Sequence, residues 1–385
     1  MNHPNRHPAA LVVLILCAAL AGTVALRTQP QSPAEIIKSV QAKLAPDTRL
    51  TVFDVKAEPK EGALEVSGEV DRVESRDAVL KALKDAGQAN LADKIAVLPD
   101  PALGPQHFAA VTVSVATMKT KPSHASELGN QLIMGMPVKV LKREGGWYLA
   151  QSLDDRYLGW MEPDHLALMT REALDAFQAA PRLVATALFT IVREAPAADA
   201  GAVSDLVMGD ILLGGEARGG WAAAQLPDGR KGYVEAAAVS DFAAWKKSRA
   251  VTPENIEKVA RLFVGVPYLW GGTSPKGFDC SGFTKTVFRA NGFELQRDAD
   301  QQAEQGQSVT MEGDLAALRK GDLLCFGPRP GVSRITHIGI YLGGKQFIHC
   351  AGRVKINSFD PASPIYSDSL LKRLVKVRRV STVTP

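Results

Sequence analysis

The sequence predicts an α+β protein of several domains: a small N-terminal α/β unit, two related β units and a C-terminal unit with helices and a β-hairpin. Three observations support this prediction. The chain has 385 residues, more than one typical domain. A β-rich segment occurs twice, at 135–161 and 209–234. A helix start and a hairpin follow in the last third of the chain.

Composition narrows the class of protein. Hydrophobic residues make up 46% and charged residues 22% of the chain, the balance of a globular protein. This excludes a disordered chain, a collagen and a multi-span membrane protein. The net charge of +4 is too small to argue for nucleic acid and is compatible with an anionic surface.

The N-terminus predicts export. Residues 9–26 form an uncharged apolar run after Arg6, so residues 1–26 are expected to be a cleaved secretory signal or a single-span membrane anchor. Cys17 suggests a lipoprotein site, although Leu16 is larger than the small residue usual before such a cysteine. We expect an exported protein of the periplasm or cell envelope. Cleavage would leave an odd number of cysteines, and therefore at least one free thiol.

Residues 35–100 predict a small α/β domain. Helical spacing covers 34–44 and 76–86, and strand patterns cover 50–55 and 64–70 with a Glu61-Gly62 turn before the second strand. The pattern resembles the BON-type small periplasmic domains. The segment contains no cluster of reactive side chains, so we interpret it as a spacer or a module that contacts the wall or lipid.

The internal repeat predicts two small β-barrels. Each copy has short strands around a Gly-Gly turn and a closing Gly-aromatic strand, and the matching pairs are Gly135 and Gly209, Trp147 and Trp221, Gln151 and Gln225, and Gly159 and Gly232. The pattern resembles bacterial SH3-like domains, which we place at 106–168 and 182–241. A helix is expected at 171–179 between them. The second copy has Arg230 where the first has Tyr157.

The last unit, 250–385, contains the segment that predicts chemistry. A Gly/Pro-rich loop delivers Cys280 to a helix start, with Asp279 well placed as the N-cap. The unpaired N–H groups of a first helical turn favour a thiolate and can hold a developing oxyanion. We therefore expect Cys280 to be an activated nucleophile. Gly282 is expected to keep the helix start thin, so that a substrate backbone can approach.

A thiolate nucleophile needs a base, and only two of the seven histidines, His337 and His349, lie in this unit. They flank an apparent hairpin. A two-residue Gly343-Gly344 turn would put them on opposite faces, whereas a three-residue loop that pairs Leu342 with Gln346 puts them on one face. We predict the three-residue loop, with His337 as the base and His349 orienting it.

Residues 254–360 resemble the NlpC-type (NlpC/p-sixty) cysteine peptidases of the bacterial cell wall. The matching segments are 267–272, 278–283, 297–302, 320–324, 337–342 and 347–349. The resemblance implies a papain-like fold of helices on an antiparallel sheet, with Cys280, His337 and His349 as the catalytic residues. It also implies an oxyanion or substrate site that contains Tyr268, Asp279, Ser281 and Asp298.

Two SH3-like barrels before such a domain resemble the γ-D-glutamyl dipeptidyl peptidases, in which the first barrel caps the groove and restricts the substrate to a free N-terminal L-alanine. Asp298 matches the position that binds the substrate amine, and Glu127 and Tyr157 are candidates for the cap. Ala299 stands where the family often has Ser, which puts one amine contact in doubt. Cys325 and Cys350 are interpreted as buried, with a disulfide between them as the alternative.

The predicted function is hydrolysis of the bond between γ-D-glutamate and L-diaminopimelate or L-lysine in peptidoglycan stem peptides. No cofactor or metal is expected, because the sequence has no His-x₃-His, Cys-x₂-Cys or Gly-x₄-Gly-Lys pattern. Expected partners are peptidoglycan or muropeptides rather than nucleic acid, and a monomer is expected. Two alternatives remain open: a wall-binding SH3-like protein with a degenerate peptidase domain, and an acyltransferase, lipase or amidase on the same fold. Acyltransferase and lipase relatives usually carry the His before the Cys.

Overall fold

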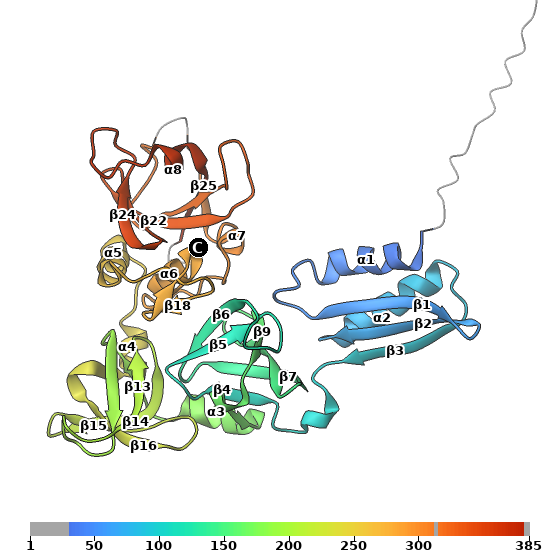
Figure 1. The fold of residues 1–385 in the computed structure, drawn as a ribbon, viewed down its shortest axis with the longest axis horizontal. Coiled ribbons are helices and arrows are strands. Elements are labelled where there is room, and N and C mark those ends of the chain that lie inside the picture. The colour runs from blue at the N-terminus through green and yellow to red at the C-terminus, as the bar shows by residue number, and fades with distance from the viewer. Residues whose placement is uncertain (1–30, 312–314, 381–385) are drawn as a thin grey trace, which may run out of the picture.

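The computed structural model describes residues 31–311 and 315–380 (Figure 1). The predicted signal or anchor, residues 1–26, lies outside the described residues. No helix within the described ranges is long and apolar enough to cross a bilayer. The structure combines helices with several separate sheets, which confirms the predicted α+β class.

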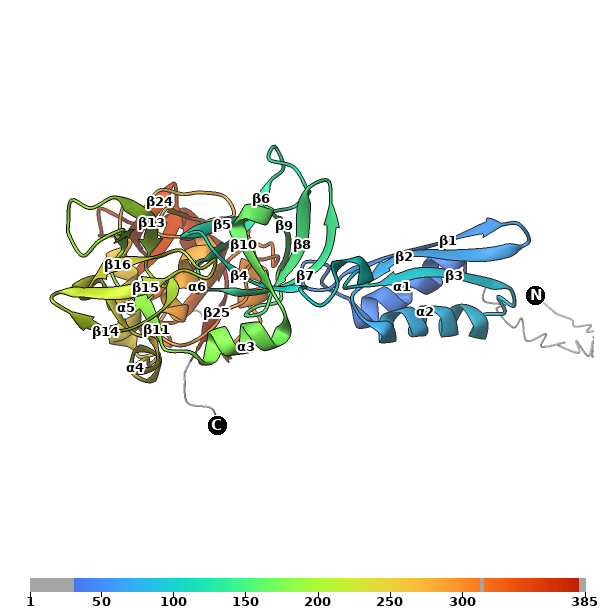
Figure 2. The same cartoon turned by 90° about the horizontal axis from the view of Figure 1, so that it is seen from below.

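The N-terminal module is a three-stranded sheet covered on one face by two helices (Figure 2). Its elements are α1 (Pro33–Leu44), β1 (Phe53–Lys60), β2 (Ala63–Val70), α2 (Val73–Asp85) and β3 (Leu91–Val97). Strand β1 is antiparallel to β2, and β3, which was not predicted, runs parallel to β2. The first strand begins at Phe53 rather than at the predicted Leu50, whose N–H instead closes a turn on the carbonyl of Asp47. The likeness to BON-type domains stays a prediction.

Two seven-stranded sheets follow, and their strands are arranged in the same order. The first runs β10-β4-β7-β8-β9-β5-β6 and the second β17-β11-β14-β15-β16-β12-β13, so each strand of one has a counterpart in the other. The first contains β4 (Phe108–Val111), β5 (Val115–Lys119), β6 (Leu128–Ile133), β7 (Pro137–Glu144), β8 (Trp147–Ser152), β9 (Leu158–Met161) and β10 (Leu166–Met169). The second contains β11 (Arg182–Ala185), β12 (Phe189–Arg193), β13 (Ala202–Val207), β14 (Ile211–Arg218), β15 (Trp221–Gln225), β16 (Lys231–Glu235) and β17 (Val239–Asp241).

The two barrels pack through equivalent segments, and the predicted helix α3 (Arg171–Ala179) connects them. Gly135 lies against Ile211, and its counterpart Gly209 lies against Ile133. Both glycines have positive φ, 80° and 99°, and a Cβ at either would collide with the isoleucine. The matched Gly135 and Gly209 of the repeat therefore serve a contact between the barrels.

The C-terminal domain packs helices against a six-stranded sheet of order β20-β25-β21-β22-β23-β24. Its strands are β18 (Thr273–Ser274), β19 (Gly277–Phe278), β20 (Gln307–Val309), β21 (Leu323–Phe326), β22 (His337–Gly343), β23 (Gln346–Ala351), β24 (Arg353–Ser358) and β25 (Leu374–Arg379). Its helices are α5 (Pro253–Leu262), α6 (Cys280–Arg289), α7 (Ala299–Gln302) and α8 (Asp368–Arg373), and α4 (Phe242–Lys247) precedes them.

The core of this domain lies between α5, α6 and the sheet. The predicted inner face of α5, which includes Ile256 and Ala260, is buried, and so are Phe283 and Val287 of α6. Helix α6 thereby lies on β22 and β23, the strands that carry the two histidines.

Candidate active site

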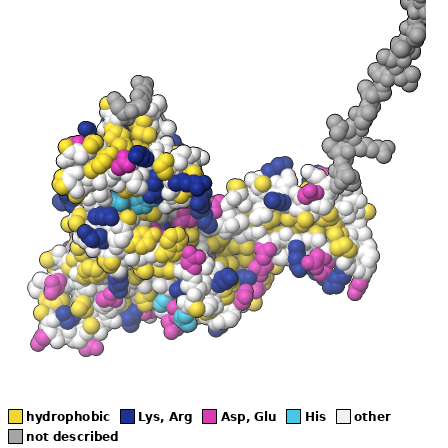
Figure 3. Space-filling model, turned by 45° about the horizontal axis from the view of Figure 1, so that its top comes forward, with side chains coloured by type: hydrophobic (Ala, Val, Ile, Leu, Met, Phe, Trp, Pro, Cys, Tyr) yellow, Lys and Arg dark blue, Asp and Glu magenta, His cyan; other side chains and the backbone are white. Residues whose placement is uncertain are grey.

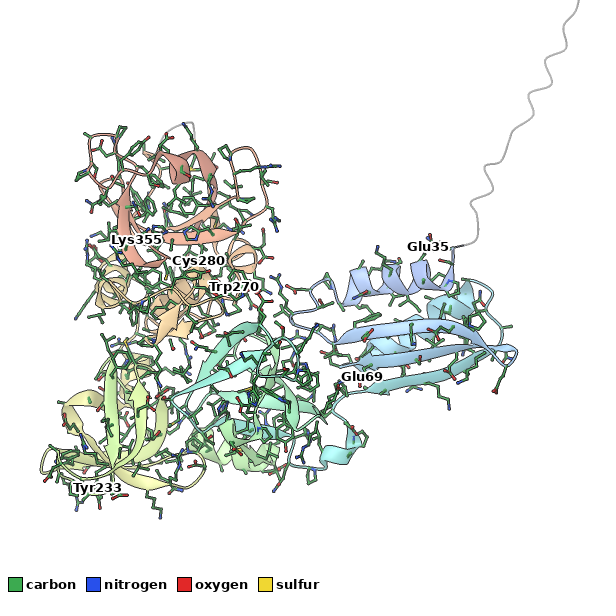
Figure 4. The ribbon with its side chains drawn as sticks, in the orientation of Figure 1. Glu35, Glu69, Tyr233, Trp270, Cys280 and Lys355 are labelled. Atoms are coloured by element: carbon green, nitrogen blue, oxygen red, sulfur yellow. The ribbon has the colours of Figure 1, made fainter. Side chains whose placement is uncertain are left out.

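Cys280 is the first residue of helix α6 and faces the sheet. Asp279 caps the helix, because its carboxylate accepts the N–H of Gly282 at 2.7 Å. Cys280 is 9% exposed, and its thiol lies against the N–H of Ile338, the residue after His337. Among the described residues the thiol makes no hydrogen bond to the His337 ring. In the view of Figure 4, Cys280 lies between the C-terminal sheet and the first barrel.

His337 and His349 are hydrogen-bonded to each other through their rings. Nε2 of His337 lies 2.7 Å from Nδ1 of His349, and Nε2 of His349 lies 2.9 Å from Oδ1 of Asn357. The amide of Asn357 is oriented by its Nδ2, which donates to the carbonyl of Ile365 at 3.0 Å.

This chain of bonds fixes where the ring protons lie. The Asn357 oxygen can only accept, so Nε2 of His349 carries a proton and its Nδ1 accepts. Nε2 of His337 must then donate, which leaves Nδ1 of His337 unprotonated. The arrangement therefore prepares one atom of His337, Nδ1, to accept a proton.

The hairpin places both histidines on one face by a route that differs from the predicted loop. Gly339 pairs with His349 as predicted, but Gly343, not Leu342, pairs with Gln346. A bulge between Tyr341 and Gly343 supplies the extra residue, and the turn itself is Gly344-Lys345, both with positive φ. A bulge and a two-residue turn thus give the same register as the predicted three-residue loop.

Burial dominates the ionisation of the site. It raises the pKa of the Cys280 thiol to about 12, and the Asp279 carboxylate adds to this, while the N–H groups of Ile338 and Ser281 act in the opposite direction. Burial lowers the pKa of His337 to about 3 and that of His349 to about 4. The expectation of a thiolate at the helix start is therefore wrong for this state. Desolvation outweighs the N–H groups, and thiol and imidazole are both neutral.

The carboxylate of Asp279 is held by a buried arginine. Arg297, 1% exposed, donates from Nη2 to Oδ2 of Asp279 at 2.5 Å and from Nη1 to Oγ of Ser281 at 2.9 Å. The Ser281 hydroxyl donates to Asp279 at 3.1 Å. Asp279 and Ser281 therefore shape the helix start, and their side chains are occupied by partners within the protein.

Tyr268 lies close enough to Cys280 for the two to interact electrostatically. Burial, followed by the charges of Cys280 and Asp279, raises the pKa of the Tyr268 phenol, which stays protonated and can donate. Gly282 has a different role from the one expected. A Cβ there would collide with the carbonyl of Gly272, so the glycine lets the loop before Cys280 pack on the helix and does not make room for substrate.

Asp298 and Tyr157 come together, whereas Glu127 does not join them. The Tyr157 hydroxyl donates to Oδ2 of Asp298 at 3.4 Å. Glu127 is exposed, and within the described residues its side chain has no hydrogen-bond or ion-pair partner. The same Asp298 oxygen accepts Nη1 of Arg49, from the N-terminal module, at 2.8 Å.

The first barrel is fixed to the C-terminal domain by buried polar contacts. Gln131 accepts the N–H of Thr273 at 2.9 Å and the hydroxyl of Ser274 at 3.0 Å. Lys285 of α6, whose side chain is 5% exposed, pairs with the fully buried Asp155 at 3.1 Å. These contacts hold Tyr157 at the edge of the site.

Cys280, Cys325 and Cys350 are all free and buried, so the alternative of a Cys325–Cys350 disulfide is wrong. The thiol of Cys350 donates to the carbonyl of Phe278 at 3.2 Å.

Three residues of this site were not singled out from the sequence: Asn357, Arg297 and Arg49. Asn357 had a local signal, because a turn at Gly352 places it on the strand that follows His349. Arg297 lay inside a matched segment without a role. Arg49 had no signal, because its partner is 249 residues away.

Two family models match segments of this chain. Residues 265–379 match the NlpC/P60 family, and residues 118–166 match the bacterial dipeptidyl-peptidase SH3 domain. A γ-D-glutamyl-L-lysine dipeptidyl-peptidase of Bacillus subtilis is 44% identical over 26% of this chain and 32% of its own length. Dipeptidyl-peptidase 6 of Lysinibacillus sphaericus is 27% identical over 70% of this chain and 98% of its own length.

A solved NlpC/P60 family protein from Bacillus cereus shares the fold, with a TM-score of 0.61 and 23% identity over 71% of this chain and 99% of that one. The matched segment thus spans about a third of the B. subtilis relative but nearly all of the L. sphaericus one. This chain therefore carries a C-terminal segment that matches the NlpC/P60 family, preceded by a segment that matches the bacterial dipeptidyl-peptidase SH3 domain.

Proposed function

We propose that this protein is an exported peptidoglycan hydrolase that cleaves the bond between γ-D-glutamate and L-diaminopimelate or L-lysine in stem peptides with a free N-terminal L-alanine. The observation that carries the proposal is the chain from Asn357 through His349 to His337, which leaves an unprotonated ring nitrogen on the strand that faces Cys280. The names of the relatives support the bond and the substrate class.

The mechanism starts from a neutral thiol and a neutral imidazole. Nδ1 of His337 takes the Cys280 proton while Sγ attacks the amide carbon. The oxyanion is bound by the N–H of Cys280, which has no intrahelical acceptor, and by the Tyr268 hydroxyl. The His337 imidazolium then protonates the leaving amine, the C–N bond breaks, and a thioester remains. His337 next takes a proton from water while the water oxygen attacks the thioester carbon. The C–S bond then breaks, the product leaves with a new carboxyl group, and the His337 imidazolium returns the proton to Sγ of Cys280.

Asp298 and Tyr157 support recognition of the free amine. Asp298 offers a carboxylate at the edge of the site, and Tyr157 brings the first barrel into contact with it. Figure 3 shows that histidine side chains reach the surface of the C-terminal domain between basic side chains, which suits a substrate that carries several carboxylates.

The test uses L-Ala-γ-D-Glu-diaminopimelate, its lysine analogue and an N-acetylated version, with Cys280→Ala as the control. Release of L-Ala-D-Glu from the free peptides alone is the expected result. Cleavage of the acetylated peptide at the same rate would refute the free-amine requirement. If no peptide is cleaved and iodoacetamide does not modify Cys280, the wall-binding alternative is favoured.

A further inference from the structure

The N-terminal module reaches into the edge of the active site. The loop between α1 and β1 lies on both the first barrel and the C-terminal domain. The N–H of Leu158 donates to the carbonyl of Arg49 at 2.8 Å, and Nε2 of Gln151 donates to the carbonyl of Leu50 at 2.8 Å. Leu158 directly follows Tyr157, so the module docks beside the residue that contacts Asp298.

The Arg49 guanidinium is held by three carboxylates. Nε and Nη2 form a fork with Asp47 at 2.9 and 2.8 Å, and Nη1 and Nη2 bind Asp300 at 2.9 and 2.8 Å. Nη1 also binds Asp298 at 2.8 Å. Gln301 donates to Asp47 at 2.7 Å, which orients the far side of the fork. Charge-assisted, bidentate contacts of this kind are the stronger hydrogen bonds of proteins.

This contact conflicts with a bound substrate amine. An ammonium group on Asp298 would need the carboxylate oxygen that Arg49 and Tyr157 already use, and it would lie beside a second positive charge. Like charges at contact distance repel. A peptide with a free amine and the docked Arg49 therefore compete for one carboxylate.

We propose that Arg49 is a specificity-determining residue that occupies the place of the substrate's N-terminal ammonium on Asp298, so that a free-amine peptide binds only by displacing it. The inference rests on the proposed function, because that function makes Asp298 the amine site. Arg49 thereby weakens the advantage of a free amine over a blocked one. Removing its charge should restore that advantage.

The experiment compares wild type, Arg49→Met and Arg49→Lys on L-Ala-γ-D-Glu-diaminopimelate and its N-acetylated form. Arg49→Met is expected to lower KM for the free peptide by about tenfold, equivalent to about 1.4 kcal/mol, with little change in kcat. The acetylated peptide should change much less, and Arg49→Lys should lower KM by less than Arg49→Met, because it keeps the cation but loses the forked bonds.

A matched control is Arg76→Met, which removes an arginine of similar exposure that pairs with Asp93 within the N-terminal module at 2.7 Å. It should leave both peptides unchanged. In an Asp298→Asn background, Arg49→Met should no longer lower KM for the free peptide. Thermal unfolding of each variant reports whether it is folded.

The outcomes separate this inference from the proposed function. If wild type and Arg49→Met cleave the free peptide with the same KM, or if Arg49→Met lowers KM equally for the free and acetylated peptides, the role of Arg49 is refuted. The proposed hydrolase function is unaffected by either result. If only Arg49→Met cleaves, the inference holds in its strongest form. If neither cleaves any peptide, the proposed function fails and the inference fails with it.

Discussion

Replacing Asn357 with Ala should slow catalysis without weakening substrate binding. The substitution removes the oxygen that accepts the Nε2 proton of His349 at 2.9 Å. The His349 proton can then move to Nδ1 and point at Nε2 of His337. In that tautomer the His337 proton sits on Nδ1, and His337 cannot accept the proton of Cys280. Asn357 is thus a positioning residue, which acts through the two rings.

The structure gives the size of the effect. Asn357 is half-buried, and a hydrogen bond in such a place contributes about 1–1.5 kcal/mol net. Losing it should reduce the productive tautomer by roughly tenfold, and kcat with it, because about 1.4 kcal/mol is a factor of ten in rate. KM for the tripeptide should stay unchanged, since Asn357 bonds to His349 and to the carbonyl of Ile365 and not to Asp298, the proposed amine site.

Asn357→Asp is the matched variant. It keeps an accepting oxygen for His349, loses the Nδ2 donation to the carbonyl of Ile365, and adds a negative charge that favours the proton on Nε2 of His349. It should retain most of kcat, and ¹⁵N NMR of the imidazoles should show the Nε2–H form of His349 in Asn357→Asp but a mixture in Asn357→Ala. A kcat equally low in both variants would show that the loop at Ile365, and not the tautomer, is what Asn357 maintains.

Three further predictions concern ionisation and packing. Because burial raises the pKa of Cys280 to about 12, its alkylation by iodoacetamide, followed site by site with mass spectrometry, should still rise between pH 8.5 and 10; a midpoint at or below the ~8.5 of a free thiol contradicts this. Burial lowers the pKa of His337 to about 3 and that of His349 to about 4, so as the pH falls the two histidines take up protons in the unfolded chain before they do in the folded protein. Their contribution to the free energy of unfolding is therefore complete above pH ~6.5 and is lost as the pH falls toward 4 and then 3. Urea unfolding at pH 7 and pH 4.5 should show this loss, and an equally steep loss in His349→Asn would argue against it. Lys285→Met should lower the free energy of unfolding by about 3–5 kcal/mol, because it leaves Asp155 charged and fully buried. Lys81→Met, at the exposed pair with Asp85, should have almost no effect. Similar values for the two variants would refute the buried pairing.

The sequence predicted best what depends on near neighbours. The caps at Thr252 and Asp279, the buried faces of α5 and α6 and the helix between the barrels all follow from residues within a few positions of one another. The pairing of Gly339 with His349 was predicted correctly, although the structure reaches it with a bulge and a two-residue turn rather than the predicted three-residue loop. Both arrangements put the two histidines on the same face of the hairpin.

What the sequence could not supply depends on distant partners. Strand β3 forms because it pairs with β2 across a helix, and no local pattern marked it. The prediction of a thiolate at Cys280 was wrong for the same reason, because it also depended on distant parts of the chain. The helix start is local, but the desolvation that outweighs it comes from the burial of Cys280 in the core between α6 and the C-terminal sheet, whose strands lie far along the chain. Arg49 meets Asp298 only because the N-terminal module docks on the first barrel through Leu158 and Gln151.

The proposed role of Asn357 depends on the neutral state of the Cys280–His337 pair. If the pair existed as thiolate and imidazolium, His337 would already carry protons on both nitrogens, and the tautomer of His349 would matter little to the first step. In the neutral pair the Cys280 proton must move during the attack, so Nδ1 of His337 has to be free beforehand, and the bond from Asn357 keeps it free. The two experiments must therefore agree. A high alkylation midpoint requires a marked fall in kcat for Asn357→Ala, and a low midpoint requires almost none. Either mixed result would separate the protonation state of Cys280 from the hydrogen-bond chain behind His337, and would show that the two are not coupled as the geometry implies.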